Sequence, residues 1–214
     1  MMRPFKYKIR HFYLNKYIIS LFGSKKYFLS YDYKHKAIWF RNPKVASRTI
    51  DDKLRSECTN FEYVYSSAVN YCPAMFRSYF KFSFVRNPES RLISAWKDKV
   101  LKQNAYQFSP VDHERMKNLD NFLTWVENFD IDTCEEHLRS QNTLIDLKNI
   151  DFLGRFESFT EDFNFVLEKL NIESRNINTI NKGIRSDIEI TESQRMRIHK
   201  IYEKDFQLFY PNEF

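Results

Sequence analysis

Glycine is scarce in this chain, with 3 residues among 214, and this scarcity limits how the protein could bind phosphate groups. The common nucleoside triphosphate loop has the pattern Gly-x-x-x-x-Gly-Lys-[Ser/Thr], and its backbone N–H groups surround the phosphates. Gly23, Gly154 and Gly183 are too far apart to form such a loop. A kinase built on that loop is therefore disfavoured, and a phosphate site here would need side-chain donors.

Cysteine is also rare, and long hydrophobic runs are missing. Cys58, Cys72 and Cys134 are an odd number of thiols without metal-ligand spacing, so the sequence predicts neither a disulfide framework nor a metal site. The most apolar N-terminal stretch, residues 17–22, is too short to span a bilayer and lacks the features of a signal peptide. We therefore expect a cytoplasmic protein that could also lie at a membrane surface.

Positive charge is concentrated at the N-terminus. The chain carries a net charge of +6, but residues 1–36 hold nine Lys/Arg and a single acid, Asp32, so the remainder is slightly acidic. With 43% hydrophobic residues, the chain as a whole has the composition of a folded protein. We expect a basic arm over residues 1–35 and one domain over residues 36–214. Such an arm could contact a membrane surface, an acidic acceptor or nucleic acid, or simply be solvated.

Short apolar segments alternate with helical patterns along the domain. Strands are expected at residues 37–40, 80–85 and 150–156. Helices are expected from residue 51, from Pro88, over residues 119–128, and after two capping-box patterns, Ser158–Glu161 and Thr191–Gln194. This alternation predicts a three-layer α/β domain with a central parallel sheet flanked by helices. Ligands in such sheets bind beyond the carboxyl ends of the strands.

Two polar stretches follow expected strands. The first, PKVASRT (residues 43–49), puts Lys44, Ser47, Arg48 and Thr49 between a strand and a helix, where backbone N–H groups also face an anion. The second, VRNPESRLISAW (residues 85–96), presents Arg86 at a strand end and a polar helix face behind it. Either stretch alone is equally consistent with a solvated surface turn. Together they indicate two separate phosphate sites.

The pair of stretches resembles the nucleotide signatures of sulfotransferases that use 3′-phosphoadenosine 5′-phosphosulfate (PAPS), and is most similar to the carbohydrate branch. The resemblance covers about residues 36–211, including DFLGRFESFTEDFNFVLEKLNI, NKGIRS and IYEKDFQLFYP. It implies a P-loop-NTPase-like fold, PAPS as sulfate donor and no metal. It also implies a set of nucleotide-binding residues: Lys44, Ala46, Ser47, Arg48 and Thr49 for the 5′-phosphosulfate, Arg86 and Ser94 for the 3′-phosphate, and Lys182 and Arg185 for a late basic segment. Arg48 departs from the family pattern, which more often has a small hydroxyl residue there.

The implied reaction is sulfuryl transfer to a hydroxyl or amine of a carbohydrate or glycan-like acceptor. Lys44 would stabilise charge on the leaving phosphate, as positioned cations do in phosphoryl transfer. His137, in EEHLRSQ, is the first choice for the general base, because an imidazole titrates in the right range. Glu135 and Glu136 are alternatives, His113 is weaker, and His11, His35 and His199 are assigned no role.

Two other functions compete with this interpretation. A different nucleotide-dependent transferase, such as a kinase, would explain the phosphate-binding stretches but not the missing glycines. A non-enzymatic nucleic-acid binder would use the basic arm and would bind in a salt-dependent way. We consider nucleic acid an unlikely partner, because the net positive charge is confined to the arm.

Overall fold

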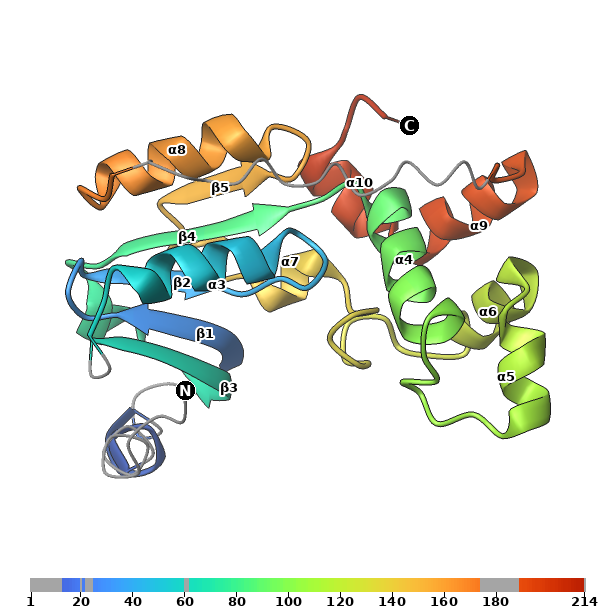
Figure 1. Cartoon of the computed structure of the whole chain (residues 1–214), viewed down its shortest axis with the longest axis horizontal. Coiled ribbons are helices and arrows are strands. Elements are labelled where there is room, and N and C mark those ends of the chain that lie inside the picture. Colours follow the sequence, from blue (N-terminus) through green and yellow to red (C-terminus); the bar gives the residue numbers. More distant parts are fainter. Residues whose placement is uncertain (1–12, 20, 22–24, 60–61, 174–188, 214) are drawn as a thin grey trace.

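The computed structural model describes residues 13–19, 21, 25–59, 62–173 and 189–213 (Figure 1). Residues 1–12 of the expected arm lie outside this range. The secondary structure in chain order, with η for a short helix that is not α-helical, is η1 (Leu14–Ile19), β1 (Lys26–Asp32), β2 (Ala37–Phe40), α3 (Ser47–Ser56), β3 (Tyr63–Asn70), η2 (Pro73–Phe76), β4 (Phe80–Val85), α4 (Pro88–Trp96), η3 (Lys97–Leu101), α5 (Pro110–Met116), α6 (Leu119–Val126), α7 (Gln141–Leu144), β5 (Phe152–Arg155), α8 (Phe159–Lys169), α9 (Glu192–Ile201) and α10 (Glu203–Phe209).

The five strands form one sheet in the order β3-β1-β2-β4-β5. The strands β2, β4 and β5 are parallel, whereas β1 runs antiparallel to both of its neighbours. All three strands expected from the sequence are therefore present, and they are the parallel ones. The α/β fold with helices on both faces of the sheet is confirmed, and an antiparallel pair extends the sheet at one side.

The expected boundary between a basic arm over residues 1–35 and a domain from residue 36 does not hold for β1. This strand lies between β2 and β3, and Tyr27, Leu29 and Tyr31 on alternate positions are buried. Among the described residues of this segment, Lys25, Lys26 and Lys34 have exposed side chains and lie at or near the ends of the strand. Burying the apolar side chains stabilises the strand within the sheet, and the nearby lysine side chains remain in solvent.

Alternate residues of the central strands face two separate cores. Ala37 and Trp39 of β2 pack with α3 and α8 on one face of the sheet. Ile38 and Phe40 face the other side, where η2, α4, α6, α9 and α10 contribute the buried side chains. This period of two is the signature of a strand that is buried on both faces, and it gives the domain its three layers.

Gly154 of β5 is the one glycine among the described residues, and its small size is required by close packing. It pairs with Phe84 of β4, and an added Cβ would lie 2.5 Å from the Phe84 ring. That ring also contacts Phe159 and Phe163 of α8. The missing side chain therefore lets an aromatic cluster fill the space between the sheet and α8.

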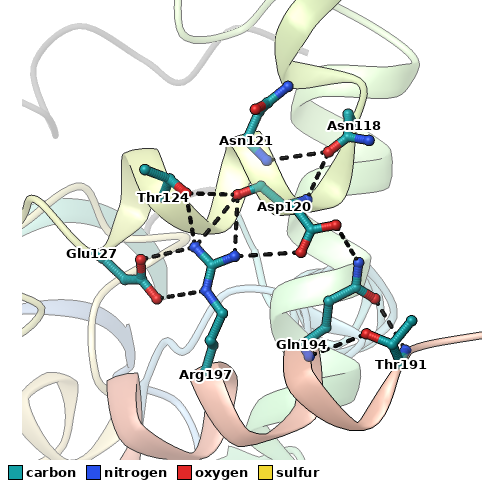
Figure 2. A network of polar contacts seen from close by, with 8 residues as sticks. All are labelled: Asn118, Asp120, Asn121, Thr124, Glu127, Thr191, Gln194 and Arg197. Atoms are coloured by element: carbon teal, nitrogen blue, oxygen red, sulfur yellow. Dashed lines mark hydrogen bonds and ion pairs between the residues drawn. The ribbon is translucent and has the colours of Figure 1, made fainter.

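Helices α4, α5, α6 and α9 gather beyond the carboxyl end of β4 (Figure 1). A polar network joins α9 to α6: Arg197 donates to both carboxylate oxygens of Glu127, at 2.8 Å each, and to Thr124 Oγ1 (Figure 2). Gln194 Nε2 donates to Asp120 Oδ2 at 2.9 Å. The C-terminal helices are thus attached to the group of helices that covers the strand ends.

The two expected capping boxes differ in outcome. Thr191 and Gln194 form both reciprocal hydrogen bonds at the start of α9. Ser158 precedes α8, but its hydroxyl donates to Asp162 and caps no backbone N–H, so that expectation is wrong. None of the described helices combines the length with the apolar composition that a membrane crossing requires.

Candidate active site

The segment over residues 42–49, called the 42–49 loop below, contains the turn after β2 and the first residues of α3, which begins at Ser47 and not at residue 51 as expected. Its turn adopts a conformation that glycine usually provides. Lys44 and Ala46 have φ values of 70° and 62°, in the left-handed region. Each such non-glycine residue costs about 1–3 kcal/mol, which the surrounding structure must offset. Ser47 Oγ donates to Asn42 O at 2.7 Å across the loop. Successive N–H groups in such backbone form a concave anion site, here without glycine.

Arg86 reaches this loop from the end of β4. Its Nη1 donates to Lys44 O at 3.1 Å and its Nε donates to Ser90 Oγ at 2.9 Å. The guanidinium lies 4.2 Å from the centroid of the Phe156 ring. Burial lowers the pKa of Arg86, and the charge of Glu157 opposes that shift. The two polar stretches of the sequence are therefore in direct contact.

Gln141 joins the ends of β2 and β4 from α7. Its Oε1 accepts from Asn42 Nδ2 at 2.7 Å and from Arg86 N at 3.0 Å, and its Nε2 donates to Arg86 O at 2.8 Å. The buried carboxylate of Asp205 accepts from the Gln141 N–H at 2.7 Å. The C-terminal helix α10 thus fixes a side chain that sets the distance between the two stretches.

Arg91, in the first turns of α4, also connects segments of the site, and it is only 1% exposed. Its guanidinium donates to three backbone carbonyls: Pro43 O at 3.2 Å, Arg139 O at 2.9 Å and Glu136 O at 3.1 Å. It therefore holds the 42–49 loop and the 136–139 segment in fixed relative positions.

These segments surround a pocket of about 520 Å³, a volume typical of small-molecule sites. It is lined by five cationic side chains, two carboxylates, one histidine and several neutral residues: Phe28, Arg41, Asn42, Pro43, Lys44, Ala46, Ser47, Arg48, Thr49, Tyr65, Arg86, Ser94, Asp98, Lys99, Glu136, His137 and Phe156. The excess of positive charge suits a ligand that carries several negative charges.

Lys44 and Asp98 form an ion pair inside the pocket, with Nζ and Oδ2 3.0 Å apart. Burial lowers the pKa of Lys44, although its hydrogen bond to Asp98 opposes the shift. Burial acts to raise the pKa of Asp98, but the hydrogen bond and charge of Lys44 hold it below its usual value. The ion pair with Asp98 thus holds the ammonium group of Lys44 in place.

His137 lies opposite the loop, on the 135–139 segment. Its Nδ1 is 2.5 Å from Glu135 Oε1, and its backbone N–H donates to Glu135 Oε2. Burial acts to raise the pKa of Glu135, but the hydrogen bond from His137 lowers it below its usual value. An ionised Glu135 favours the imidazole tautomer with the proton on Nδ1, which leaves Nε2 as an acceptor.

Eight of the ten residues expected at the site line this one pocket: Lys44, Ala46, Ser47, Arg48, Thr49, Arg86, Ser94 and His137. Lys182 and Arg185 lie outside the described residues. Arg48 is exposed yet lines the pocket. Among the aromatic residues, Tyr65 lines the pocket, whereas Tyr71 and Phe76 are buried in the core.

The comparison with protein-family models gives one finding that covers most of the chain. Residues 10–211 match the model of the family described as "Sulfotransferase family". The chain belongs to the sulfotransferase family. Neither the curated proteins nor the solved structures contain a significant match to it. The matched range includes β1, in agreement with the position of that strand inside the sheet.

Family membership makes this protein a PAPS-dependent sulfotransferase and sets aside the kinase and nucleic-acid alternatives. PAPS supplies the sulfuryl group when it is bound. The residues present fit such a polyanion: the loop with two left-handed residues, the clamped Arg86 and the excess of lining cations all favour negative charge.

The sequence interpretation missed several polar residues of this sulfotransferase site. Asn42 and Gln141 are fully buried, and so are Arg91 and Asp205. Arg41, which follows β2, also lines the pocket, with its guanidinium 3.6 Å from the Tyr65 ring centroid. The position of Arg41 directly after a strand was a usable signal, since ligands gather at strand ends.

Proposed function

We propose that this sulfotransferase transfers a sulfuryl group from PAPS to a hydroxyl or amine of a carbohydrate or glycan-like acceptor. The observation that carries the proposal is that the 42–49 loop, Arg86 and the His137 segment line one pocket. The acceptor class rests on the resemblance of PKVASRT and VRNPESRLISAW to the carbohydrate branch. Tyr65 and Phe28 in the pocket wall support it, because aromatic rings pack well against sugar rings.

The phosphate groups of the donor are assigned to two sides of the pocket. Lys44, Ala46, Ser47, Arg48 and Thr49 would hold the 5′-phosphosulfate through side-chain donors and loop N–H groups. Arg86 and Ser94 would hold the 3′-phosphate. Lys44 is assigned the charge that develops on the leaving phosphate, which is where a fixed cation lowers the barrier most.

His137 is assigned as the general base that takes the proton from the acceptor. Its contact with Glu135 orients the ring and stabilises the imidazolium that forms. Glu136 lines the same pocket and is the alternative base.

The test is transfer of labelled sulfate from PAPS to a panel of glycans, glycolipids and small phenols. We expect label on carbohydrate hydroxyls or amines. Transfer to phenols alone would contradict the carbohydrate assignment while leaving sulfuryl transfer intact. Calorimetry with adenosine 3′,5′-bisphosphate, against ATP with Mg²⁺, reports the donor site separately.

Replacing Arg86 by alanine is expected to weaken bisphosphate binding about 10- to 100-fold, because a charge-assisted hydrogen bond contributes about 1.5–3 kcal/mol. Arg155→Ala is the matched control. Arg155 also ends a strand and lies 5.0 Å from an aromatic ring, that of Tyr210, but it does not line the pocket. Calorimetry that gives equal losses for both variants would remove Arg86 from the phosphate site.

His137→Gln is expected to lower kcat about 10²- to 10⁴-fold with little change in bisphosphate affinity, since a general base acts on the chemical step. His113→Gln is the control, because the His113 ring lies beside Val100 O and does not line the pocket. Steady-state rates measure kcat for His137→Gln. An unchanged rate there, with a loss in Glu136→Gln, would make Glu136 the base.

A further inference from the structure

A second cluster of titratable side chains lies at the end of β2 away from the pocket. Asp32 ends β1, His35 lies in the turn between β1 and β2, and Cys58 follows the end of α3. In Figure 1 these ends meet at the side of the sheet away from α4. Three segments thus bring a carboxylate, an imidazole and a thiol together, and none of the three lines the pocket.

The ligand atoms of this cluster are close enough to share one ion. His35 Nδ1 is 2.7 Å from Asp32 Oδ2, and Cys58 Sγ is 3.4 Å from Asp32 Oδ1 and 4.0 Å from His35 Nδ1. Around a tetrahedral zinc ion, ligand atoms lie about 3.3–3.7 Å apart, given metal–ligand distances of about 2.0–2.3 Å. Small side-chain rotations would convert the present arrangement into a coordination sphere.

We propose that Asp32, His35 and Cys58 form a binding site for one zinc ion. A set of one sulfur, one nitrogen and one oxygen ligand favours zinc over calcium or magnesium, which prefer oxygen ligands alone. The carboxylate is held rigidly, because Asp32 is 2% exposed and accepts from the His35 backbone N–H at 2.9 Å. The fourth position is left for water.

Such an ion would act on the fold rather than on the reaction. It would tie the β1–β2 turn to the far end of α3, the helix that begins at the 42–49 loop. A metal that binds the native chain and not the unfolded one raises the temperature of unfolding. The ligands of this site do not form a short sequence motif, because Asp32 and Cys58 are 26 residues apart.

The test is thermal unfolding of the chelator-treated full chain with and without added zinc. We expect one zinc per chain and an increase in Tm of about 5–10 °C at a hundredfold excess of free zinc over Kd. Cys58→Ser keeps a donor to Asp32 but removes the thiolate, so it should lose the shift. Cys134→Ser should keep it, because Cys134 is a half-buried thiol outside the cluster.

Cobalt provides a readout that does not depend on stability. Added Co²⁺ should give a thiolate-to-metal charge-transfer absorption in the wild type and in Cys134→Ser, and none in Cys58→Ser or His35→Gln. Absence of this absorption and of a zinc-dependent Tm shift in the wild type would overturn the proposal. An equal Tm shift in wild type and Cys58→Ser would overturn it as well. Both measurements are independent of sulfuryl transfer.

Discussion

Replacing Lys44 by alanine is expected to lower kcat for sulfuryl transfer about 10²- to 10³-fold, while bisphosphate affinity falls less than about tenfold. The reason is that its ammonium group, positioned by Asp98, is assigned to charge that exists mainly in the transition state. Removing one preorganised donor from an oxyanion site costs about 2.7–4 kcal/mol in kcat. Single-turnover rates with labelled PAPS, beside calorimetry with the bisphosphate, separate the two effects.

Lys53→Ala is the matched control for this prediction. Lys53 lies on α3, directly after the loop, its side chain is 15% exposed like that of Lys44, and it forms an ion pair with Glu57 at 2.7 Å. It does not line the pocket. If both variants lost kcat equally, the effect would come from a disrupted ion pair near α3 and not from charge at the reacting group. A Lys44→Ala variant with unchanged kcat would remove the lysine from the reaction.

The parallel strands β2 and β4 could be predicted because their side chains are buried on both faces. Residues 37–40 and 80–85 are dense in aromatic and β-branched side chains, and each ends at a polar residue followed by a helix start. The site residues follow from the same logic, since the carboxyl ends of parallel strands meet at one edge. Burial and chain order thus suffice to bring Lys44 and Arg86 together.

The strand β1 could not be recognised from charge, although its alternation was visible. Tyr27, Leu29 and Tyr31 recur every second residue, yet lysines on either side of them indicated a solvated segment. Net charge averages over side chains that point in different directions, whereas a strand separates them onto two faces. The pattern of apolar positions was the better signal here.

The clamps of the site could not be predicted, because polar residues are buried only when distant partners accept their hydrogen bonds. Gln141 bonds to Asn42, 99 residues away, and to Arg86, 55 residues away. In the sequence nothing distinguishes Gln141 from a glutamine on the protein surface. Its burial depends on contacts that exist only after the sheet and α10 have assembled.

Replacing Arg91 by methionine is expected to lower the free energy of unfolding by about 3–4 kcal/mol, which is large for a single substitution. Three hydrogen bonds from a charged group would be lost, and the cost would be offset in part because the guanidinium no longer has to be buried. Arg91→Lys should be no more stable than Arg91→Met, since one ammonium group replaces a planar fork and leaves its charge buried. Urea unfolding measures both.

Arg115→Met serves as the control, because Arg115 is 66% exposed and its nearest carboxylate oxygen, on Asp112, is 3.8 Å away. The free energy of unfolding of Arg115→Met should differ from that of the wild type by less than about 0.5 kcal/mol. A folded Arg91→Met enzyme should also bind bisphosphate more weakly, because Pro43 and Glu136 would no longer be held by one side chain. Wild-type affinity together with wild-type stability would mean that Gln141 alone sets the spacing of the two stretches. If Arg91→Met lowered both the free energy of unfolding and the affinity for bisphosphate, the geometry of the pocket would depend on Arg91.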